Sequence, residues 1–292
     1  MGSKIVAMTA NFQFGVSEFT TNPWPFERDV ETYARLGVSA IEVCEAKLDP
    51  ARIAAQMDSI QAAGLEITSV QPKTRTLFPS LSQPEPTDIG ERMKLFRQTI
   101  ETLSPWTPGV AYVTNTGIPP GGNMQEVLDR AATEYRALAE FAAGFGVKVA
   151  LEPLNASIVN IETAIWTVPQ AMEIVRAVDR GNFGICLDSW NVWQNAGIHA
   201  EIQACGLKIF VVQISDWRTP RSFLDRLVPG QGAIPLPAFL KSVHAAGFRG
   251  AYSVEIFSSG VPGALWDGDL EQVITDSKAG MDAAWDAAGI TD

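Results

Sequence analysis

The chain has 292 residues, of which 46% are hydrophobic and 19% are charged, as in an ordinary globular protein with a sizeable core. Its formal net charge is −11, and an acidic surface repels phosphate groups, so nucleic acid and anionic membranes are poor partners. No apolar run is long enough to span a membrane, and the chain does not begin with a basic segment followed by an apolar one. Cys44, Cys186 and Cys205 have no paired spacing and indicate buried thiols in a reducing compartment. We therefore expect a cytoplasmic protein.

In chain order, apolar runs alternate with amphipathic stretches. The runs expected to be strands span residues 4–10, 38–44, 65–71, 109–115, 147–152, 183–188, 208–213 and 251–256. The stretches expected to be helices span residues 26–36, 50–63, 88–104, 124–145, 168–179, 197–205, 235–246 and 269–287. Most of the runs are rich in Val and Ile, as in strands that are buried on both faces.

Strict alternation of eight strand–helix units predicts a parallel sheet with right-handed crossovers. Eight is the number of units that closes into a (β/α)8 TIM barrel, which we expect to form a single domain over residues 1–292. The alternative is an open doubly wound sheet. Such a sheet is expected to have a glycine-rich phosphate-binding loop after its first strand, and residues 9–15 do not match that motif. Two long loops, 72–87 and 214–234, follow strand ends and should overhang the mouth of the barrel.

Four successive apolar runs each end in a single acid or amide, namely Glu152, Asp188, Gln213 and Glu255. Any one of them alone could be a helix cap, an ion-pair partner or a buried amide bonded to backbone. Four in register indicate a shared role, because the carboxyl ends of barrel strands meet at one mouth. Three carboxylates and one amide are oxygen ligands that suit Mg²⁺ or Mn²⁺, with Co²⁺ as an alternative. We expect all four to hold a divalent metal.

The same residues suit proton transfer. A metal can polarise a carbonyl as a Lewis acid, and the C–H group beside that carbonyl then becomes acidic. One carboxylate can remove the proton while another acid returns it on the opposite face. Glu152 and Glu255 follow the fifth and eighth strands, so they could flank a substrate from two sides. These two residues are our candidates for the catalytic acid and base.

The chain has only two histidines, His199 and His244, and both fall in expected outer helices. A surface or packing role is therefore the expectation for both. Histidine-rich zinc motifs and a Ser-His-Asp triad at the mouth are excluded, so proton transfer must use other groups.

The loops that follow the strands supply candidate substrate-binding residues. Arg218 and Arg221 could clamp a carboxylate or phosphate, although pairing with Asp216 and Asp225 is an equal alternative. Trp190 and Trp217 could stack on a sugar ring, with packing beneath the loops as the alternative. Polar residues at the ends of the second, third and fourth strands could support the site or bind hydroxyl groups: Glu42, Gln71 and Asn115.

With these residues in place, the chain resembles the xylose-isomerase-like barrel superfamily. That superfamily includes sugar-phosphate isomerases and epimerases, ketose 3-epimerases, hydroxypyruvate isomerases, inosose and dehydroshikimate dehydratases, and endonuclease IV. The resemblance covers nearly the whole chain, and its strongest parts are LEPLN, LDSWN, QISD with the following PGQG, and VEIFS. It implies a metal role for Glu152, Asp188, Gln213 and Glu255. It also implies that Glu152 and Glu255 act as the acid–base pair, as in the ketose epimerases.

Two positions depart from the commoner pattern of that superfamily. Many relatives have histidine where this chain has Gln213, whereas the hydroxypyruvate isomerases and dehydroshikimate dehydratases look similar in using glutamine. Many also have a substrate-contacting histidine where this chain has Asn191, which becomes a candidate substrate contact. The histidines that endonuclease IV needs for its extra metals are missing, which disfavours DNA repair.

Our first interpretation is a metal-dependent isomerase or epimerase that acts on a small keto-sugar or hydroxy-keto acid through an enediolate. The alternative is a lyase or dehydratase that uses the same site, including β-elimination from a keto-sugar. A non-catalytic sugar-binding barrel is the third interpretation, although three buried carboxylates are costly to keep without a cation. The expected partner is a sugar-like small molecule, and relatives of this kind commonly form homo-oligomers.

Overall fold

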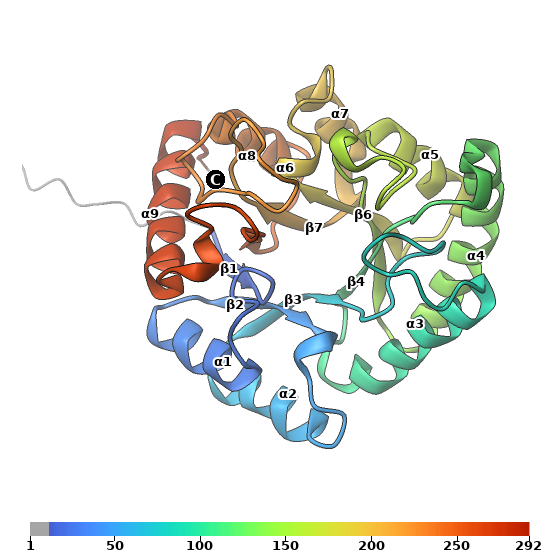
Figure 1. Ribbon diagram of the computed structural model, residues 1–292, viewed down its shortest axis with the longest axis horizontal. Coiled ribbons are helices and arrows are strands. Elements are labelled where there is room, and N and C mark those ends of the chain that lie inside the picture. Colours follow the sequence, from blue (N-terminus) through green and yellow to red (C-terminus); the bar gives the residue numbers. More distant parts are fainter. Residues whose placement is uncertain (1–11, 292) are drawn as a thin grey trace, which may run out of the picture.

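The computed structural model of the chain describes residues 12–291, within which eight parallel strands close into a barrel. Figure 1 shows these strands at the centre, with the helices in a ring around them. The strands are β1 (Phe14–Ser17), β2 (Ala40–Cys44), β3 (Glu66–Gln71), β4 (Ala111–Thr114), β5 (Lys148–Leu151), β6 (Phe183–Asp188), β7 (Ile209–Ile214) and β8 (Tyr252–Val254). Each strand pairs with its neighbours in sequence, and β8 closes the barrel on β1. The predicted (β/α)8 barrel is confirmed.

The helices also follow the predicted order. They are α1 (Phe26–Arg35), α2 (Ile53–Ala62), α3 (Ile89–Leu103), α4 (Met124–Gly144), α5 (Val168–Val178), α6 (Ser189–Val192), α7 (Ile198–Cys205), α8 (Leu236–Ala245) and α9 (Leu270–Ala288). The short helix α6, directly after β6, was not predicted. Asp188 caps it by accepting a hydrogen bond of 2.9 Å from the backbone N–H of Trp190.

The first barrel strand is β1 rather than the segment 4–10 that the sequence suggested. Segment 4–10 lies outside the described residues, and the pairing of β1 with both β2 and β8 leaves no gap in the barrel for another strand. The sequence FGVS is short, and its glycine and serine give it a weak apolar pattern. Gly15 stands in close contact with β8, because a Cβ atom at this position would lie 2.8 Å from the side-chain oxygen of Ser253.

Local sequence explains where several helices begin and end. Thr167 and Gln170 form a capping box at the start of α5, so two backbone N–H groups that would otherwise lack partners are satisfied. Gly64 and Gly146 follow α2 and α4 in the left-handed conformation, with φ of +74° and +69°, which glycine adopts without a steric penalty.

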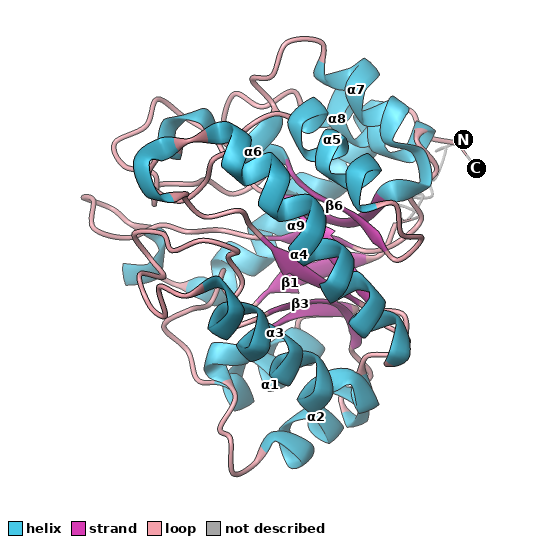
Figure 2. Cartoon of the chain, turned by 90° about the vertical axis from the view of Figure 1, so that its right-hand side faces the viewer, coloured by secondary structure: helices cyan, strands magenta, loops and turns pink. Residues whose placement is uncertain are grey.

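The barrel strands are tightly packed and support the loops at one end of the barrel. Every residue of β2, β4, β6 and β8 is buried, as expected for strands that are covered by helices on the outside and filled by side chains on the inside. Figure 2 shows the longer loops projecting from one end of the barrel. Within residues 12–291, no helix has the length and apolar character that crossing a membrane would require.

Candidate active site

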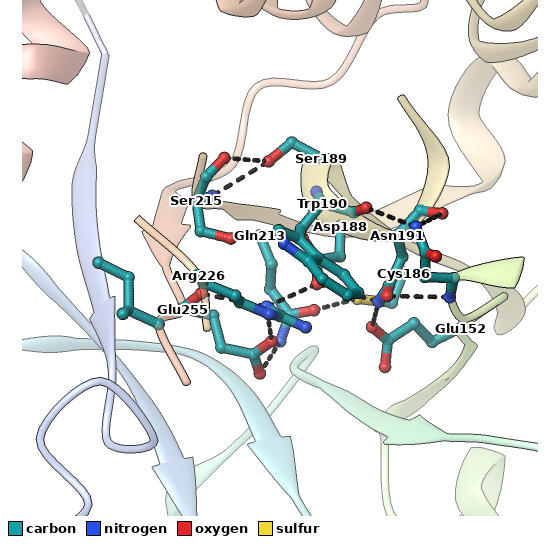
Figure 3. A network of polar contacts seen from close by, with 12 residues as sticks. Glu152, Cys186, Asp188, Ser189, Trp190, Asn191, Gln213, Ser215, Arg226 and Glu255 are labelled. Atoms are coloured by element: carbon teal, nitrogen blue, oxygen red, sulfur yellow. Dashed lines mark hydrogen bonds and ion pairs between the residues drawn. The ribbon is translucent and has the colours of Figure 1, made fainter. Parts of the chain in front are cut away.

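Three buried carboxylates meet at the carboxyl end of the barrel. Glu152 follows β5, Asp188 ends β6 and Glu255 follows β8. One oxygen from each lies within 4.8 Å of the others, and none of the three residues is more than 6% exposed. Figure 3 shows the three side chains converging on one region. The structure thus brings together the three acids that the strand ends predicted, and we call them the carboxylate cluster.

The sequence reading missed Arg226, which contacts two members of the carboxylate cluster. Its guanidinium lies 2.8 Å from Asp188 Oδ2 and 2.8 Å from Glu255 Oε2, and the residue is 6% exposed. Its guanidinium carbon also lies over the ring of Trp190, 5.1 Å from the ring centre. The apolar residues Leu227 and Val228 directly after it were the available signal, because they indicate that this part of the loop turns inward.

Two amides orient Glu152. Asn115, next to the end of β4, donates a hydrogen bond of 3.0 Å to Glu152 Oε2. Asn191 in α6 donates one of 2.8 Å to Glu152 Oε1 and one of 3.0 Å to Asp188 Oδ2. Both were predicted as substrate contacts, and the structure places both in the wall of the site. Their bonds fix the carboxylate of Glu152 from two directions.

Gln213 in β7 pairs with Asp188 in β6 and presents its amide nitrogen to two other acids. Its Nε2 donates to both oxygens of Glu42, at 2.9 and 3.0 Å, and to Glu255 Oε1 at 2.8 Å. Its Oε1 accepts a hydrogen bond from the thiol of Cys186 at 3.0 Å. Glu42 also accepts a bond of 2.6 Å from Ser69. Gln213 therefore supports Glu255 in this arrangement, and its role as a metal ligand stays a prediction.

Burial governs the acidity of the carboxylate cluster. Loss of water raises the pKa of Glu152 to about 7, and the nearby charge of Asp188 adds to this shift. Burial also raises the pKa of Asp188 and moves that of Glu255 well above its ordinary value, although the charge of Arg226 opposes both shifts. The common cause is that three acids are withdrawn from water with one guanidinium between them.

A cavity of about 140 Å³ opens directly above the carboxylate cluster. Glu152 and Glu255 lie in its wall, together with Gln71, Asn115 and Asn191. Its apolar wall consists of Phe19, Leu154, Ile158, Trp190, Phe223, Leu224 and Phe257. Segments 72–87 and 214–234 both contribute residues to the wall, which confirms that both loops overhang the mouth.

Other predicted residues lie away from this cavity. Arg218 and Arg221 both pair with the buried carboxylate of Asp225, at 2.9 and 2.7 Å, which is the alternative that the sequence left open. Trp217 packs on Trp193 with 5.2 Å between ring centres. None of these is among the described residues that line the cavity, so their role in binding substrate stays a prediction.

The two histidines lie in outer helices, as expected. His199 is in α7 and bonds to Ser242, and His244 is in α8 and meets the edge of Trp285. Neither is among the described residues that line the cavity.

The residues of the site fit a divalent cation. When all are ionised, the carboxylate cluster and Arg226 together carry a net charge of −2, because three acids face one guanidinium. Burying such an excess of negative charge is costly unless a cation balances it. Carboxylate oxygens are also the donors that hard divalent ions prefer. A divalent cation would therefore match both the charge and the donor type of the site.

Comparison with known proteins agrees with this geometry. The family model described as xylose isomerase-like TIM barrel matches residues 30–281. The chain is 35% identical over 169 residues to an inosose isomerase of Bacillus subtilis, with 56% of this chain and 59% of that protein aligned. It is 36% identical over 138 residues to a 3-dehydroshikimate dehydratase of Pseudomonas aeruginosa, with 44% of this chain and 21% of that protein aligned. The alignments thus span less than two thirds of the length of either relative.

The fold also occurs among solved structures. The crystal structure of the IolI protein with a bound zinc atom superposes on this chain with a TM-score of 0.77 and 24% sequence identity. The superposition covers 94% of this chain and 98% of that one. At this level of identity the likeness shows a shared fold.

Proposed function

Because the chain belongs to the xylose isomerase-like TIM barrel family, we propose that it is a divalent-metal-dependent isomerase or epimerase of a small sugar-like substrate. The substrate would be a keto-sugar or a hydroxy-keto acid. The observation that carries the proposal is the meeting of Glu152, Asp188 and Glu255 in one cluster, two of whose members, Glu152 and Glu255, line the cavity. The similarity to inosose isomerases supports the same reaction class.

Glu152 and Glu255 would move the proton. They follow β5 and β8, three strands apart in a barrel of eight, so they reach the cavity from different sides. Asn115 and Asn191 hold the carboxylate of Glu152, and Arg226 holds that of Glu255. One carboxylate would take the proton from the carbon beside the substrate carbonyl, and the other would return a proton to complete the isomerisation.

The carboxylate cluster would also hold the cation. Mn²⁺ or Mg²⁺ bound by Glu152, Asp188 and Glu255 would act as a Lewis acid that makes the C–H group beside a carbonyl more acidic. Asn191 bonds to both Glu152 and Asp188, so it fixes two of these carboxylates relative to each other. Phe19 and Phe257 would exclude water from the bound substrate, because both rings face the cavity.

The second candidate is a lyase or dehydratase that uses the same residues. Its support is the similarity to a 3-dehydroshikimate dehydratase. Removal of a proton beside a carbonyl is common to both reactions, and only the later loss of a leaving group distinguishes them. Glu152 or Glu255 would protonate that leaving group, since neither histidine borders the cavity within the described part of the chain.

Hydrogen exchange with solvent tests both candidates. The protein would be loaded with Mn²⁺ and incubated in D₂O with ketoses, hydroxy-keto acids and keto-polyols, while NMR follows C–H exchange and product. The proposal predicts exchange with formation of an isomer or epimer, and loss of both in the presence of a chelator. Loss of water from the substrate would instead favour the dehydratase. Exchange that is unchanged by a chelator would contradict the metal-dependent mechanism.

A further inference from the structure

Arg75 borders the cavity, and its guanidinium group lies over the ring of Phe19. It follows β3 and is half-buried, with its guanidinium carbon 5.5 Å from the centre of the Phe19 ring. Its backbone is fixed, because its carbonyl oxygen accepts hydrogen bonds from Thr114 at 2.7 Å and from the N–H of Asn115 at 3.0 Å. Among the described residues, its guanidinium makes no hydrogen bond or ion pair. The structure therefore presents a fixed cation at the cavity whose charge is not neutralised.

The other arginines around the mouth are already engaged. Arg226 pairs with Asp188 and Glu255, and Arg218 and Arg221 share Asp225. Among the described residues that line the cavity, Arg75 is thus the one cationic side chain that is free to bind a ligand.

A second guanidinium near Arg75 strengthens the positive potential at this end of the cavity. Arg92 is fully buried and donates to the carbonyl oxygens of Thr76 and Pro86, each at 2.7 Å, so it pins the loop that carries Arg75. No carboxylate pairs with it in the described part of the chain. Burial, and to a smaller extent the charge of Arg75, lower the pKa of Arg92, while the charge of Glu85 opposes this shift. Two guanidinium groups near each other make this end of the cavity more positive, which favours an anion beside them.

Another acid of the cavity wall, Glu162, is also engaged elsewhere. Glu162 accepts hydrogen bonds from the N–H and the hydroxyl of Ser82, at 2.9 and 2.6 Å, and makes no ion pair with Arg75.

A single residue, Asn115, connects Arg75 to the reacting groups. Asn115 bonds through its N–H to Arg75 and through its side chain to Glu152. A small substrate that reaches Glu152 would therefore have one end near Arg75.

We propose that Arg75 binds an anionic group of the substrate, either a carboxylate or a phosphate ester. The proposal rests on the function proposed above and narrows its substrate to acids rather than uncharged polyols. A guanidinium group can bind either anion through two parallel N–H donors. The ring of Phe19 would keep the plane of the guanidinium in place. Arg75 would then select for charge, while the carboxylate cluster performs the reaction.

Binding of matched probe pairs tests the proposal without turnover. Calorimetry would compare shikimate with its methyl ester, and fructose 6-phosphate with fructose, on Mn²⁺-loaded wild type, Arg75→Gln, Arg75→Lys and Arg28→Gln. Arg28 is the matched control because it lies over the ring of Trp24, 4.1 Å from its centre, away from the cavity. In at least one pair the charged member should bind wild type about tenfold more tightly than the neutral one. Which pair shows this preference distinguishes a carboxylate from a phosphate.

The variants decide whether Arg75 is responsible. Arg75→Gln should abolish the preference, Arg75→Lys should keep part of it, and Arg28→Gln should keep all of it. Equal binding of charged and neutral probes to wild type, or failure of both charged probes to bind, would overturn the proposal. A preference that survives in Arg75→Gln would overturn it as well. Because these are binding measurements, a preference for acids without any C–H exchange would leave Arg75 supported while the isomerase proposal failed.

Discussion

Two clusters of buried acids lie near the carboxyl ends of the strands, and they differ in net charge and in access to the cavity. The carboxylate cluster, with Arg226 beside it, opens to the cavity. The second cluster consists of Glu18 after β1, Asp29 in α1 and Lys47 in the 3-10 helix η1 (Glu45–Lys47), and none of these residues is among those that line the cavity. Lys47 bonds to Asp29 and to the carbonyl oxygen of Thr21 at 3.1 Å. We call this second group the closed cluster.

The comparison shows that buried acids with shifted pKa values do not by themselves mark an active site. Burial moves the pKa of Glu18 well above its ordinary value and raises that of Asp29, much as it does in the carboxylate cluster. Two acids share one lysine in the closed cluster, so its net charge is −1 when all are ionised, against −2 for the carboxylate cluster with Arg226. Lys47 contacts Asp29 and the carbonyl oxygen of Glu18, so the closed cluster joins β1, α1 and η1. The carboxylate cluster retains excess charge and faces a cavity, so it can take up a cation and a substrate.

The largest expected effect separates the two clusters by activity. Glu255→Gln should lower turnover by at least about 10³-fold, because the amide cannot accept or return a proton. Glu18→Gln is the matched control, since it makes the same change in the closed cluster and should leave turnover close to that of wild type. The measurement is the rate of product formation under saturating Mn²⁺. Near-normal turnover in Glu255→Gln would contradict the assignment of Glu255.

The next effect separates the clusters by stability. Lys47→Met should lower the free energy of unfolding by about 3 kcal/mol, because it leaves a buried acid without its cation. Adding Asp29→Asn should recover much of that loss. Lys278→Met is the control, because Lys278 pairs with Asp282 at the surface with 42% of its side chain exposed. Urea denaturation measures all three, and a loss in Lys47→Met no larger than in Lys278→Met would contradict a role for the closed cluster in stability.

A third change tests whether a cation can replace the guanidinium of Arg226. Arg226→Met should destabilise the metal-free protein by about 2 kcal/mol, because charged hydrogen bonds to Asp188 and Glu255 are lost. Mn²⁺ should then raise the melting temperature of the variant more than that of wild type. The same Mn²⁺ shift in both proteins would show that Arg226 and the ion do not share the charge of these acids.

The smallest effect is a pH dependence in the closed cluster. Because the folded-state pKa of Glu18 is raised, its contribution to stability is complete below the unfolded-state pKa of about 4.3 and is lost as pH rises through the folded-state value. The charged groups facing Glu18 are Lys47 and Asp29, while Tyr33 and Cys44 beside it stay neutral because burial raises the pKa of both. Glu18→Gln should therefore gain stability relative to wild type, by about 1 kcal/mol, as pH rises above ~4.3. A difference that does not change with pH would contradict this account.

The barrel and the acids of the site could be predicted because both produce a regular pattern in the sequence. Buried parallel strands read as apolar runs, and a polar residue at the end of such a run stands out, which is how Glu152, Asp188 and Glu255 were found. Strand β1 gave a weaker apolar pattern, because Gly15, in close contact with β8, stands where an apolar side chain would otherwise be expected.

Contacts between distant segments could not be predicted in the same way. Loop 214–234 contains several arginines, and only the fold shows that Arg226 turns inward while Arg218 and Arg221 pair with Asp225. The closed cluster joins three segments whose spacing in the sequence has no pattern. Arg75 lies four residues beyond the end of β3, so a search for polar residues directly at strand ends did not find it.

Equilibrium binding of Mn²⁺ tests most directly the claim that the carboxylate cluster, and not the closed cluster, is a cation site. Titration followed by electron paramagnetic resonance would compare wild type, Glu255→Gln and Glu18→Gln. The account predicts one tightly bound ion per chain in wild type, markedly weaker binding in Glu255→Gln, and unchanged binding in Glu18→Gln. Absence of bound Mn²⁺ in wild type, or equal weakening in both variants, would contradict it.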